Sequence, residues 1–573
     1  MDKKLIVDIL NEIGLLLELK GESPFKSRAY YNAAKTIETL DQDIETLVKQ
    51  DKLKEIKGIG DALNKKLTEL VTTGKLDYYE KLKASIPTGL IDMLKIPGLG
   101  PKKVRALYEK LNIKSIRELE YACMENRLVE LQGFGEKTQR KIYDGIQFIK
   151  QHTGQYLYAE AFNEAVRLKK FLESTGLVQR CDIAGSLRRR KEVVKDVDML
   201  ASSHYPGELM DAFVSYEDVR EIIAKGDTKS SVILNSGINT DLRVVKDEEY
   251  PYALHHFTGS KEHNTAMRHR AKKMGIKMNE YGLFHGEDLI ICRDEEDIFN
   301  RLNLSYIPPE LRENMGEIEA AERGEIPSLI QDDDIKGIFH VHTTYSDGSN
   351  SLYDMVQAAR ASGYKYIGIS DHSKSAFYAG GLKEETVLRQ LDEIEELNRS
   401  FSDIVILKGI ESDILPDGSL DYDEDILEKF DFVIVSVHSH FKMSREEMTE
   451  RLIKAIKNKY TKILGHCSGR LLLAREGYDF DVYKVIDTAA EYGKIIEINA
   501  NPYRLDLDWR YVKYAKDRGV KFAINPDAHN IGGLNDIKYG VGIARKGWLE
   551  ARDVLNTYDV DIVGSEKYFV YLD

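Results

Sequence analysis

The pattern of hydrophobic and polar positions divides the chain into three stretches. Residues 1 to about 150 read as helices joined by short loops. From about 180 to 300 the pattern changes to short β-rich runs, such as 193-VVKDVDMLA-201 and 238-INTDLRVV-245, mixed with helices. Beyond residue 335, short apolar strands alternate with helical stretches of about 10 to 20 residues, as in successive βα units. We therefore expect a multidomain chain with a helical, an α+β and an α/β part.

Three loops of the helical stretch repeat one pattern: an apolar residue, Gly-x-Gly, then a helix with Lys or Arg in its first turns. They are 56-IKGIGDALNKKL-67, 96-IPGLGPKKVRAL-107 and 131-LQGFGEKTQRKI-142. Two glycines allow a tight turn whose backbone N–H groups, at a helix N-terminus, can meet a phosphate oxygen. A single copy is more simply explained as the end of one helix followed by the start of another. Three copies, each followed by basic residues, favour DNA binding. The candidate DNA-binding residues are Gly58, Gly60, Gly98, Gly100, Gly133 and Gly135.

The repeated loop resembles the helix-hairpin-helix motif, which grips the DNA backbone. Residues 95–145 carry 11 Lys plus Arg against 7 Asp plus Glu, so this region is locally basic. The formal charge of the whole chain is −14, which argues only mildly against DNA binding because basic residues can cluster. The excess of acidic residues lies outside residues 95–145.

Composition narrows the class of protein. A chain of 573 residues has room for about three to five domains, and 42% hydrophobic with 31% charged residues is typical of a globular protein. No apolar run reaches the roughly 18 residues of a membrane span, and the N-terminus lacks a signal-peptide layout, so we expect a cytoplasmic protein without membrane contact. The cysteines follow no Cys-x-x-Cys spacing and are expected to be reduced thiols; they are Cys123, Cys181, Cys292 and Cys467.

Two carboxylates two residues apart mark the first candidate catalytic site. Asp196 and Asp198 leave the same face of a β-type run, and Asp241 in the segment TDLRVV completes the set if its strand lies alongside. Three carboxylates can hold the two divalent ions, Mg or Mn, that nucleotidyl transfer requires. Upstream, Gly185, Ser186 and Arg189 offer close backbone approach, a hydroxyl and a cation for phosphates.

This series resembles the family X DNA polymerases, because Gly-Ser, Asp-x-Asp and Asp-Leu-Arg are followed by 256-HFTGSKEHNTAMRHRAKKMGIKMNEYGLF-284. The resemblance implies a nucleotidyltransferase-type palm with a small thumb, acting on gapped or primed DNA and dNTPs. It implies that Asp196, Asp198 and Asp241 bind the metals, with Asp241 nearest the primer 3′-hydroxyl. The implied nucleotide-binding residues are Gly185, Ser186 and Arg189 for the triphosphate, Phe257 and Gly259 for the sugar, Asn264 for the base edge and Arg268 for the template side.

At three positions the resemblance does not decide the role of the residue. His256 stands where many relatives have tyrosine, and Asn239 where some have arginine, so discrimination between deoxy- and ribonucleotides is not settled by the sequence. Some relatives use a lysine of the first helix-hairpin-helix domain as a Schiff-base nucleophile against 5′-deoxyribose phosphate, and Lys66 falls at that place. An ordinary phosphate-binding lysine explains Lys66 equally well.

Every histidine after residue 335 falls at or just after the end of a strand-like run. The runs are 337-GIFHVHTTYSD-347, 366-YIGISDHS-373, 404-IVILKGIES-412, 432-FVIVSVHSH-440, 462-KILGHC-467 and 521-KFAINPDAH-529. The ends of successive parallel strands converge on one face of a barrel. Mixed nitrogen and oxygen ligands without a thiolate suit two or three Mn, Zn or Fe ions. The candidate ligands are His340, His342, Asp347, His372, Glu411, His438, His466, Asp527 and His529, with His440 in reserve.

These runs resemble the PHP (polymerase and histidinol phosphatase) domain, which implies a distorted (β/α)7 barrel with a trinuclear metal site over residues 336–573. The expected layout is a lyase-like helical domain (1–85), a fingers-like helix-hairpin-helix domain (86–150), palm (151–245), thumb (246–315), linker (316–335) and barrel (336–573). The two resemblances together imply a monomeric bacterial-type family X polymerase that fills short gaps in base-excision repair. Its barrel would add a Mn-dependent 3′-5′ exonuclease that processes 3′ ends, and the resemblance also allows cleavage at abasic sites.

Two other classes stay open. The chain could be a DNA-binding repair nuclease or scaffold with one active catalytic centre, or a PHP phosphatase of small substrates. Nucleotide addition that depends on Asp196 and Asp198 separates the polymerase from the scaffold. Phosphate release from a small monoester, faster than degradation of a DNA 3′ end, would favour the phosphatase.

Overall fold

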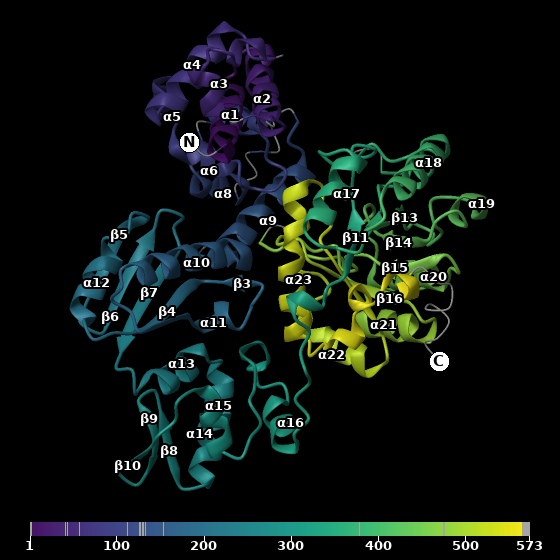
Figure 1. Ribbon diagram of the computed structural model, residues 1–573. Coiled ribbons are helices and arrows are strands. Elements are labelled where there is room, and N and C mark those ends of the chain that lie inside the picture. Colours follow the sequence, from purple (N-terminus) through teal and green to yellow (C-terminus); the bar gives the residue numbers. More distant parts are fainter. Residues whose placement is uncertain are drawn as a thin grey trace. The chain divides into compact units, whose positions relative to one another are not determined.

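The computed structural model describes residues 3–563 except 41, 43, 57, 112, 125–127, 129–130, 132, 153, 377–378 and 474–475. The chain forms two compact units, residues 1–153 and 154–573. Figure 1 labels their helices and strands, which are numbered in chain order. Among the described residues, no helix is both long and apolar enough to span a membrane.

The first unit is helical and has its own apolar core. Helices α1 and α2 contribute Ile6, Leu10, Ile13, Ala33 and Ile37 to this core, which continues through the later helices. Apolar positions recur three or four apart along α1, which gives the helix one buried stripe. The helices are α1 (Lys3–Leu19), α2 (Pro24–Glu38), α3 (Ile44–Lys49), α4 (Asp61–Thr73), α5 (Asp77–Ala84), α6 (Thr88–Met93), α7 (Pro101–Leu111), α8 (Ile116–Met124) and α9 (Glu136–His152).

The second unit begins with a five-stranded palm sheet in the order β2-β4-β7-β6-β5. The central strands β4 and β7 are parallel, whereas the other neighbours are antiparallel. Alternation along β6 and β7 buries every second residue, as expected for a sheet covered by helices on one face. The elements are α10 (Tyr158–Ser174), β2 (Arg180–Ile183), α11 (Gly185–Arg188), β4 (Asp196–Ser202), α12 (Pro206–Val214), β5 (Val219–Lys225), β6 (Lys229–Leu234) and β7 (Asn239–Val245), with the two-residue strands β1 (Tyr156–Leu157) and β3 (Val193–Val194).

The thumb packs three helices against a small antiparallel sheet, β10-β9-β8. Its elements are α13 (Tyr250–Thr258), α14 (Lys261–Lys273), β8 (Ile276–Asn279), β9 (Gly282–His285), β10 (Asp288–Ile290) and α15 (Glu295–Arg301). The segment that we expected to link thumb and barrel contains α16 (Glu317–Arg323). In that segment Ala320, Ala321 and Leu329 are buried in one apolar cluster with Trp548 of the barrel. The connecting segment therefore packs against the barrel.

The C-terminal part is a barrel of seven parallel strands in sequential order, β11 to β17, with helices outside it (Figure 1). Backbone bonds from His342 N to Ala528 O and from Ala528 N to His340 O link its first and last strands, so the barrel is nearly closed. This confirms the predicted (β/α)7 architecture. The strands are β11 (Gly337–Val341), β12 (Tyr366–Ile369), β13 (Val405–Asp413), β14 (Phe432–Ser436), β15 (Thr461–Leu464), β16 (Ile495–Asn499) and β17 (Phe522–Asn525).

Helices alternate with these strands, and side-chain caps begin several of them. Ser351 accepts a bond from Asp354 N at the start of α17, and Ser444 and Glu447 form a capping box on α20. Strands β11, β12, β14, β16 and β17 are buried along their whole length, which is typical of a parallel sheet covered by helices. The main helices are α17 (Leu352–Ala361), α18 (Glu384–Ser400), α20 (Arg445–Lys457), α21 (Val482–Glu491), α22 (Trp509–Asp517) and α23 (Ile537–Lys546).

Candidate functional site

The three Gly-x-Gly loops share one backbone geometry. Their first glycines, Gly58, Gly98 and Gly133, all have positive φ, a conformation that glycine adopts without steric cost. The residue between the glycines is buried and its N–H donates three residues back: Ile59 to Ile56, Leu99 to Ile96 and Phe134 to Leu131, at 2.9 to 3.0 Å. Gly60, Gly100 and Gly135 are exposed and directly precede α4, α7 and α9. Each turn thus presents an open helix N-terminus beside basic residues.

The palm brings the three predicted aspartates together on two adjacent strands. Asp198 is the register partner of Asp241 across the parallel pair β4 and β7, and Asp196 is the partner of Asn239. Burial, followed by the charges of Asp196 and Asp241, raises the pKa of Asp198 to about 6. Carboxylates that lie this close together form a pocket of negative potential suited to cations.

Two residues that the sequence did not single out hold Asp241. Ser231 Oγ donates to Asp241 Oδ1 at 2.6 Å, and Lys229 Nζ lies 2.6 Å from Oδ2. Both come from β6, the antiparallel neighbour of β7, where Ser231 is the register partner of Asp241. No sequence pattern marks them, because their role depends on strand pairing.

The Gly185–Ser186 turn, which begins α11, lies against Asp198. Gly185 has φ +63°, and a Cβ built on it would lie 2.2 Å from Asp198 Oδ2, so any other residue would be strained and would displace this carboxylate. Ala184 N donates to Asp198 O at 2.8 Å, which joins the turn to β4. Ser186 is half-buried in the same turn.

Arg189 is more enclosed than a purely phosphate-facing cation would be. Its side chain is one-tenth exposed; Nε donates to Glu313 Oε1 at 3.0 Å and Nη1 to Thr258 O at 2.5 Å. Glu313 was not anticipated from the sequence, since it lies 124 residues away in the chain. Arg189 therefore joins the Gly185–Ser186 turn to the thumb.

The thumb residues lie around the turn that ends α13. Gly259 has φ +62° and caps this helix. Asn264 Nδ2 donates to His256 O at 2.7 Å, and the guanidinium of Arg243 lies 4.4 Å from the ring centroid of Phe257. Arg268 is exposed on α14. His256 is half-buried, and burial lowers the pKa of its imidazole.

Lys66 lies on α4 between two tyrosines. Its ammonium nitrogen contacts Tyr30 Oη and lies 3.2 Å from the ring centroid of Tyr78. Desolvation by burial lowers the pKa of Lys66. The side chain is therefore partly desolvated beside an aromatic face, which favours the uncharged amine more than an open surface does.

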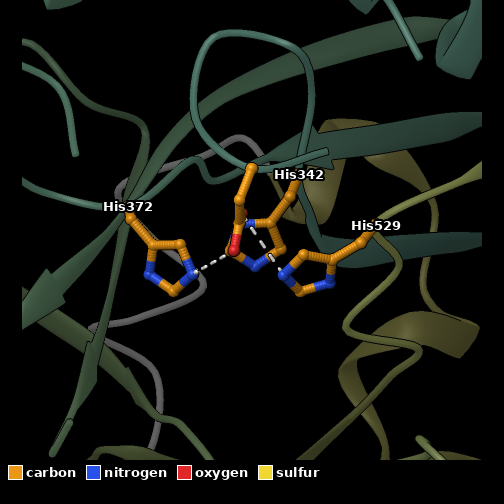
Figure 2. Close-up of side chains that lie close together, drawn as sticks. His342, His372 and His529 are labelled. Atoms are coloured by element: carbon orange, nitrogen blue, oxygen red, sulfur yellow. Dashed lines mark ion pairs between the residues drawn. The ribbon is translucent and has the colours of Figure 1, made fainter. Parts of the chain in front are cut away.

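All nine predicted ligands of the barrel meet at the carboxyl ends of the strands. Figure 2 shows the imidazoles of His342, His372 and His529 pointing toward one another. Among the described residues, groups whose ligand atoms all lie within 4.8 Å of one another are His342-Asp347-His372-His529, His340-His466-Asp527, His340-His342-Glu411 and His372-Glu411-His438. His440, held in reserve, is exposed and belongs to none of them.

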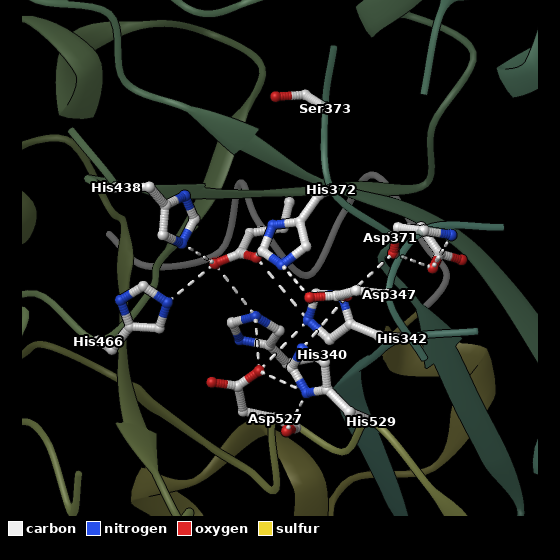
Figure 3. A network of polar contacts seen from close by, with 12 residues as sticks. His340, His342, Asp347, Asp371, His372, Ser373, His438, His466, Asp527 and His529 are labelled. Carbon is white, nitrogen blue, oxygen red and sulfur yellow. Dashed lines mark hydrogen bonds and ion pairs between the residues drawn. The ribbon is translucent and has the colours of Figure 1, made fainter. Parts of the chain in front are cut away.

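Glu411 is the centre of this cluster. Its carboxylate oxygens lie 2.9 Å from His466 Nε2, 2.9 Å from His372 Nδ1 and 3.2 Å from His340 Nε2. Asp527 Oδ1 lies 3.2 Å from His342 Nε2, and Asp347 Oδ1 lies 3.4 Å from His529 Nε2 (Figure 3). A carboxylate with several imidazoles around it can bridge two metal ions.

Carboxylates behind the ligands were missed by the sequence reasoning. Glu497 on β16 is fully buried and lies 2.6 Å from His340 Nδ1. Asn525 Nδ2 and His466 N donate to the same carboxylate. Asp413 contacts His438 Nδ1 in the same manner. The available signal was the run 495-IIEIN-499, an apolar strand with one acid and no histidine, as in 404-IVILKGIES-412.

The donor set fits multiple divalent ions. Burial, then the neighbouring rings of His372 and His529, lowers the pKa of His342 to about 3, so this imidazole is neutral as a metal ligand must be. Although burial alone raises it, His438 and His340 hold the pKa of Glu411 well below its usual range. His340 Nε2, His342 Nε2 and Glu411 Oε2 are buried and meet other candidate ligands in ion pairs, without an aligned hydrogen bond among the described residues. Such buried atoms are satisfied when an ion binds between them.

Local backbone strain accompanies the cluster. His340 has φ +58° and Asp527 has φ +51°, a conformation that side-chain-bearing residues rarely adopt. Strain of this kind persists where the surrounding structure holds a residue in place, and it concentrates at functional sites. The barrel thus holds two candidate ligands, His340 and Asp527, in a backbone conformation of higher energy.

Family models match four segments of the chain. A helix-hairpin-helix domain matches residues 1–76, and a SAM-like helix-hairpin-helix tandem matches residues 90–147. The DNA polymerase beta thumb matches residues 253–313, and the PHP domain matches residues 339–501. These matches confirm the helix-hairpin-helix and PHP resemblances.

One curated relative matches nearly the whole chain, and others match about a third of it. The DNA polymerase/3′-5′ exonuclease PolX of Bacillus subtilis (strain 168) is 39% identical over 560 residues, which cover 97% of each chain. A probable phosphatase of Thermoanaerobacter sp. (strain X514) is 32% identical over 235 residues, or 38% of this chain and 89% of the phosphatase. A probable phosphatase of Acetivibrio thermocellus is 29% identical over 199 residues, or 33% of this chain and 78% of that protein. Because the similarity to the first relative is end to end, the chain belongs to the bacterial PolX family of DNA polymerase/3′-5′ exonucleases, with helix-hairpin-helix, DNA polymerase beta thumb and PHP domains.

Proposed function

We propose that this protein fills short gaps in DNA during base-excision repair, adding nucleotides at the palm and trimming 3′ ends at the barrel. The observation that carries the proposal is the register of Asp198 opposite Asp241 on parallel strands, in a chain that also holds a nine-ligand cluster. The Gly-x-Gly turns would hold the DNA backbone through their open helix N-termini. DNA and dNTPs are thus the proposed substrates.

At the palm, Mg or Mn ions held by Asp196, Asp198 and Asp241 would lower the pKa of the primer 3′-hydroxyl and neutralise the triphosphate. Ser231 and Lys229 orient the Asp241 carboxylate, the group nearest the proposed position of the 3′-hydroxyl. The absence of a side chain at Gly185 lets the backbone of the turn approach the phosphates. Ser186 and Arg189 add a hydroxyl and a cation.

The remaining nucleotide contacts are proposed for the thumb. Phe257 and Gly259 form the sugar side of the pocket, Asn264 faces the base edge and Arg268 the template side. The bond from Asn264 to the His256 carbonyl fixes the Asn264 amide, so its direction is set before a nucleotide binds. Whether His256 permits ribonucleotides is tested by comparing dNTP and rNTP addition.

At the barrel, two or three Mn ions are proposed to activate water and clamp the phosphodiester at a DNA 3′ end. The nine ligands would hold them, while Glu497 and Asp413 fix the tautomers of His340 and His438 through the ring nitrogens that do not face the cluster. Arg504, whose Nε lies 3.4 Å from Asp527 Oδ2, adds a positive charge beside the site. Abasic-site cleavage is the same water attack on another phosphoester.

The test uses a 5′-labelled primer on a one-nucleotide-gapped template with Mn, with and without dNTPs. Wild type is expected to lengthen the primer with dNTPs and to shorten it without them. Asp196→Ala with Asp198→Ala should remove only the lengthening, and His340→Ala with His342→Ala only the shortening. Lengthening that survives the aspartate changes would refute the polymerase site, and shortening that survives the histidine changes would refute the barrel site.

Lys66 is proposed as a 5′-deoxyribose phosphate lyase nucleophile. Its lowered pKa and its place beside Tyr30 and Tyr78 support a reactive amine. Borohydride should trap the wild-type protein on DNA with a 5′-deoxyribose phosphate, whereas Lys66→Ala should not be trapped. Lys65→Ala, a change at the exposed neighbour, is the control. Equal trapping of wild type and Lys66→Ala would assign Lys66 to phosphate binding instead.

A phosphatase of small substrates is a second candidate, favoured by the similarity of about a third of the chain to probable phosphatases. Its test compares phosphate release from a small monoester with shortening of the labelled primer at equal enzyme concentration. Faster release from the monoester would favour this candidate. Faster shortening of DNA would favour the exonuclease, and a protein that does neither would leave a DNA-binding scaffold.

A further inference from the structure

Helix α23 of the barrel lies against the palm segment that follows the Gly185–Ser186 turn. A Cβ built on Gly542 would lie 2.8 Å from Arg190 Cδ, so the helix backbone is in close contact with this segment. Arg190 Nη1 donates to Lys538 O at 3.4 Å, and the rings of Tyr158 and Tyr539 meet edge-on at 6.0 Å. The barrel is therefore a direct neighbour of the loop that carries Arg189.

Lys546, at the end of α23, is the most enclosed charge of this contact. Its side chain is fully buried, and Nζ donates to Arg189 O at 2.9 Å, Glu310 O at 3.2 Å and Glu313 Oε1 at 2.6 Å. The same ammonium lies 4.4 Å from the ring centroid of Trp509. A lysine is almost never fully buried unless it is paired, and here its hydrogen-bond acceptors are the Arg189 carbonyl and two groups of the segment Glu310–Glu313.

Glu313 is shared between the barrel and the palm. One oxygen, Oε1, accepts both from Lys546 Nζ and from Arg189 Nε. Although burial alone raises it, Lys546 and Arg189 lower the pKa of Glu313, so the carboxylate is charged. Arg189 also donates to Thr258 O, next to Gly259. Lys546, Glu313 and Arg189 thus form a chain from the barrel to both sides of the proposed nucleotide pocket.

We infer that Lys546 of the exonuclease barrel is a positioning residue for nucleotide addition at the palm, acting through Glu313 on Arg189. This inference rests on the proposed polymerase function and on the assignment of Arg189 to the triphosphate. Lys546 itself touches no substrate. It holds the Arg189 carbonyl directly and neutralises part of the charge on Glu313.

The electrostatics explain why Lys546 matters. With Lys546 in place, Glu313 orients the Arg189 guanidinium while its negative charge is divided between two cations. Without Lys546, the buried carboxylate would depend on Arg189, with Lys191 Nζ farther away at 4.0 Å from Oε2. Arg189 would then be drawn more fully to Glu313 and less to a phosphate, because a buried charge requires a partner. Binding of the incoming dNTP should weaken, while the metal-binding aspartates keep their place.

The experiment measures single-nucleotide gap filling by full-length wild type, Lys546→Met, Glu313→Gln and the double variant. Lys546→Met is expected to raise KM for the dNTP about tenfold, because Arg189 turns to the charged Glu313, and Glu313→Gln is expected to raise KM similarly, because the Arg189 guanidinium loses the carboxylate that orients it; kcat should stay within about twofold. The double variant should match Glu313→Gln, because Lys546 acts through Glu313 and the two effects are then not additive. Primer shortening without dNTPs should stay at the wild-type rate, and Lys538→Met, an exposed lysine on the same helix, should change neither activity.

Three results would overturn the inference. One is an unchanged KM in Lys546→Met; another is a double variant whose KM rise is the product of the single rises; the third is an equal loss of extension and shortening, which indicates general damage. If Lys546→Met does not fold, judged by thermal unfolding, Glu313→Gln alone decides, and a wild-type KM in that variant overturns the inference. A wild type that extends no primer would refute the proposed polymerase function instead.

Discussion

Asp198 on β4 and Asp241 on β7 are register partners on two hydrogen-bonded parallel strands. Side chains at paired positions of neighbouring strands lie on the same face of a sheet, so the two carboxylates share one pocket. Asp196, two residues before Asp198, lies on the same face. This pairing is the geometric core of the proposed polymerase site.

Asp241→Asn is expected to lower primer extension by about a thousandfold, because a neutral amide replaces a carboxylate that binds metal in the proposed reaction. Exonuclease activity should not change. Asp211→Asn is the matched control, since Asp211 pairs with Lys225 away from the pocket. Extension assays with saturating dNTP measure both. An Asp241→Asn protein as active as the control would show that Asp241 is not a catalytic ligand.

Gly185→Ala is expected to lower extension by about a hundredfold, because the new Cβ would lie 2.2 Å from Asp198 Oδ2 and must displace it. The positive φ of Gly185 adds strain in any other residue. Gly207→Ala serves for comparison, since a Cβ there meets no atom within 4 Å. Equal extension rates in the two variants would contradict the close packing of the turn on Asp198.

Glu497→Gln is expected to weaken metal binding at the barrel by about 10- to 100-fold, because Glu497 orients His340 from behind. Metal content after dialysis and the rate of primer shortening should fall together, whereas extension should not change. Glu491→Gln, at an exposed glutamate on α21, is the reference. Full metal content in Glu497→Gln would show that this carboxylate does not support metal binding.

Chelation is expected to lower the unfolding temperature of the second unit and to stop primer shortening. The ion-free cluster is a buried set of imidazoles and carboxylates around Glu411. Ions that bind only the folded state stabilise it, by about 2.7 kcal/mol at a free concentration of 100 times Kd. Calorimetry with and without Mn measures the shift. His340→Ala with His342→Ala should show a much smaller shift, and an equal shift would place the ions elsewhere.

Lys494 gives an expected pH dependence of stability. Burial, then the charge of Lys462, lowers the pKa of Lys494 to about 8, while its ammonium donates to Asn458 O and Thr461 O. The unfolded chain keeps the ordinary pKa of about 10.4 and therefore binds more protons between these values. The free energy of unfolding contributed by this residue rises with pH in that window.

The comparison of wild type with Lys494→Met isolates this effect. Wild type should gain stability relative to the variant as the pH rises from 7 to 10, measured by denaturant unfolding at several pH values. Lys457→Met, a change on neighbouring α20, controls for the loss of one lysine. A difference between wild type and Lys494→Met that is independent of pH would show that Lys494 is not desolvated.

The clustering of the candidate ligands could be predicted from the sequence, because a residue that follows a strand of a parallel barrel must lie on the carboxyl face, whichever strand it follows. His340, His372, Glu411 and Asp527 were therefore placed together without knowledge of any distance. The same holds for Asp196 and Asp198, which share a face through the two-residue period of a strand. Local periodicity also determined the three hairpin turns, since each needs glycine at one positive φ.

Which side chains support these residues from the side away from the site could be learned only from the packing of the folded chain. Glu497 supports His340 from 157 residues away, and Lys546 reaches the Arg189 carbonyl across 357 residues. The period of a helix or strand defines the face of a residue but not the element that packs on that face. Ion pairs between distant segments depend on how whole layers are packed, and that information is not local in the sequence.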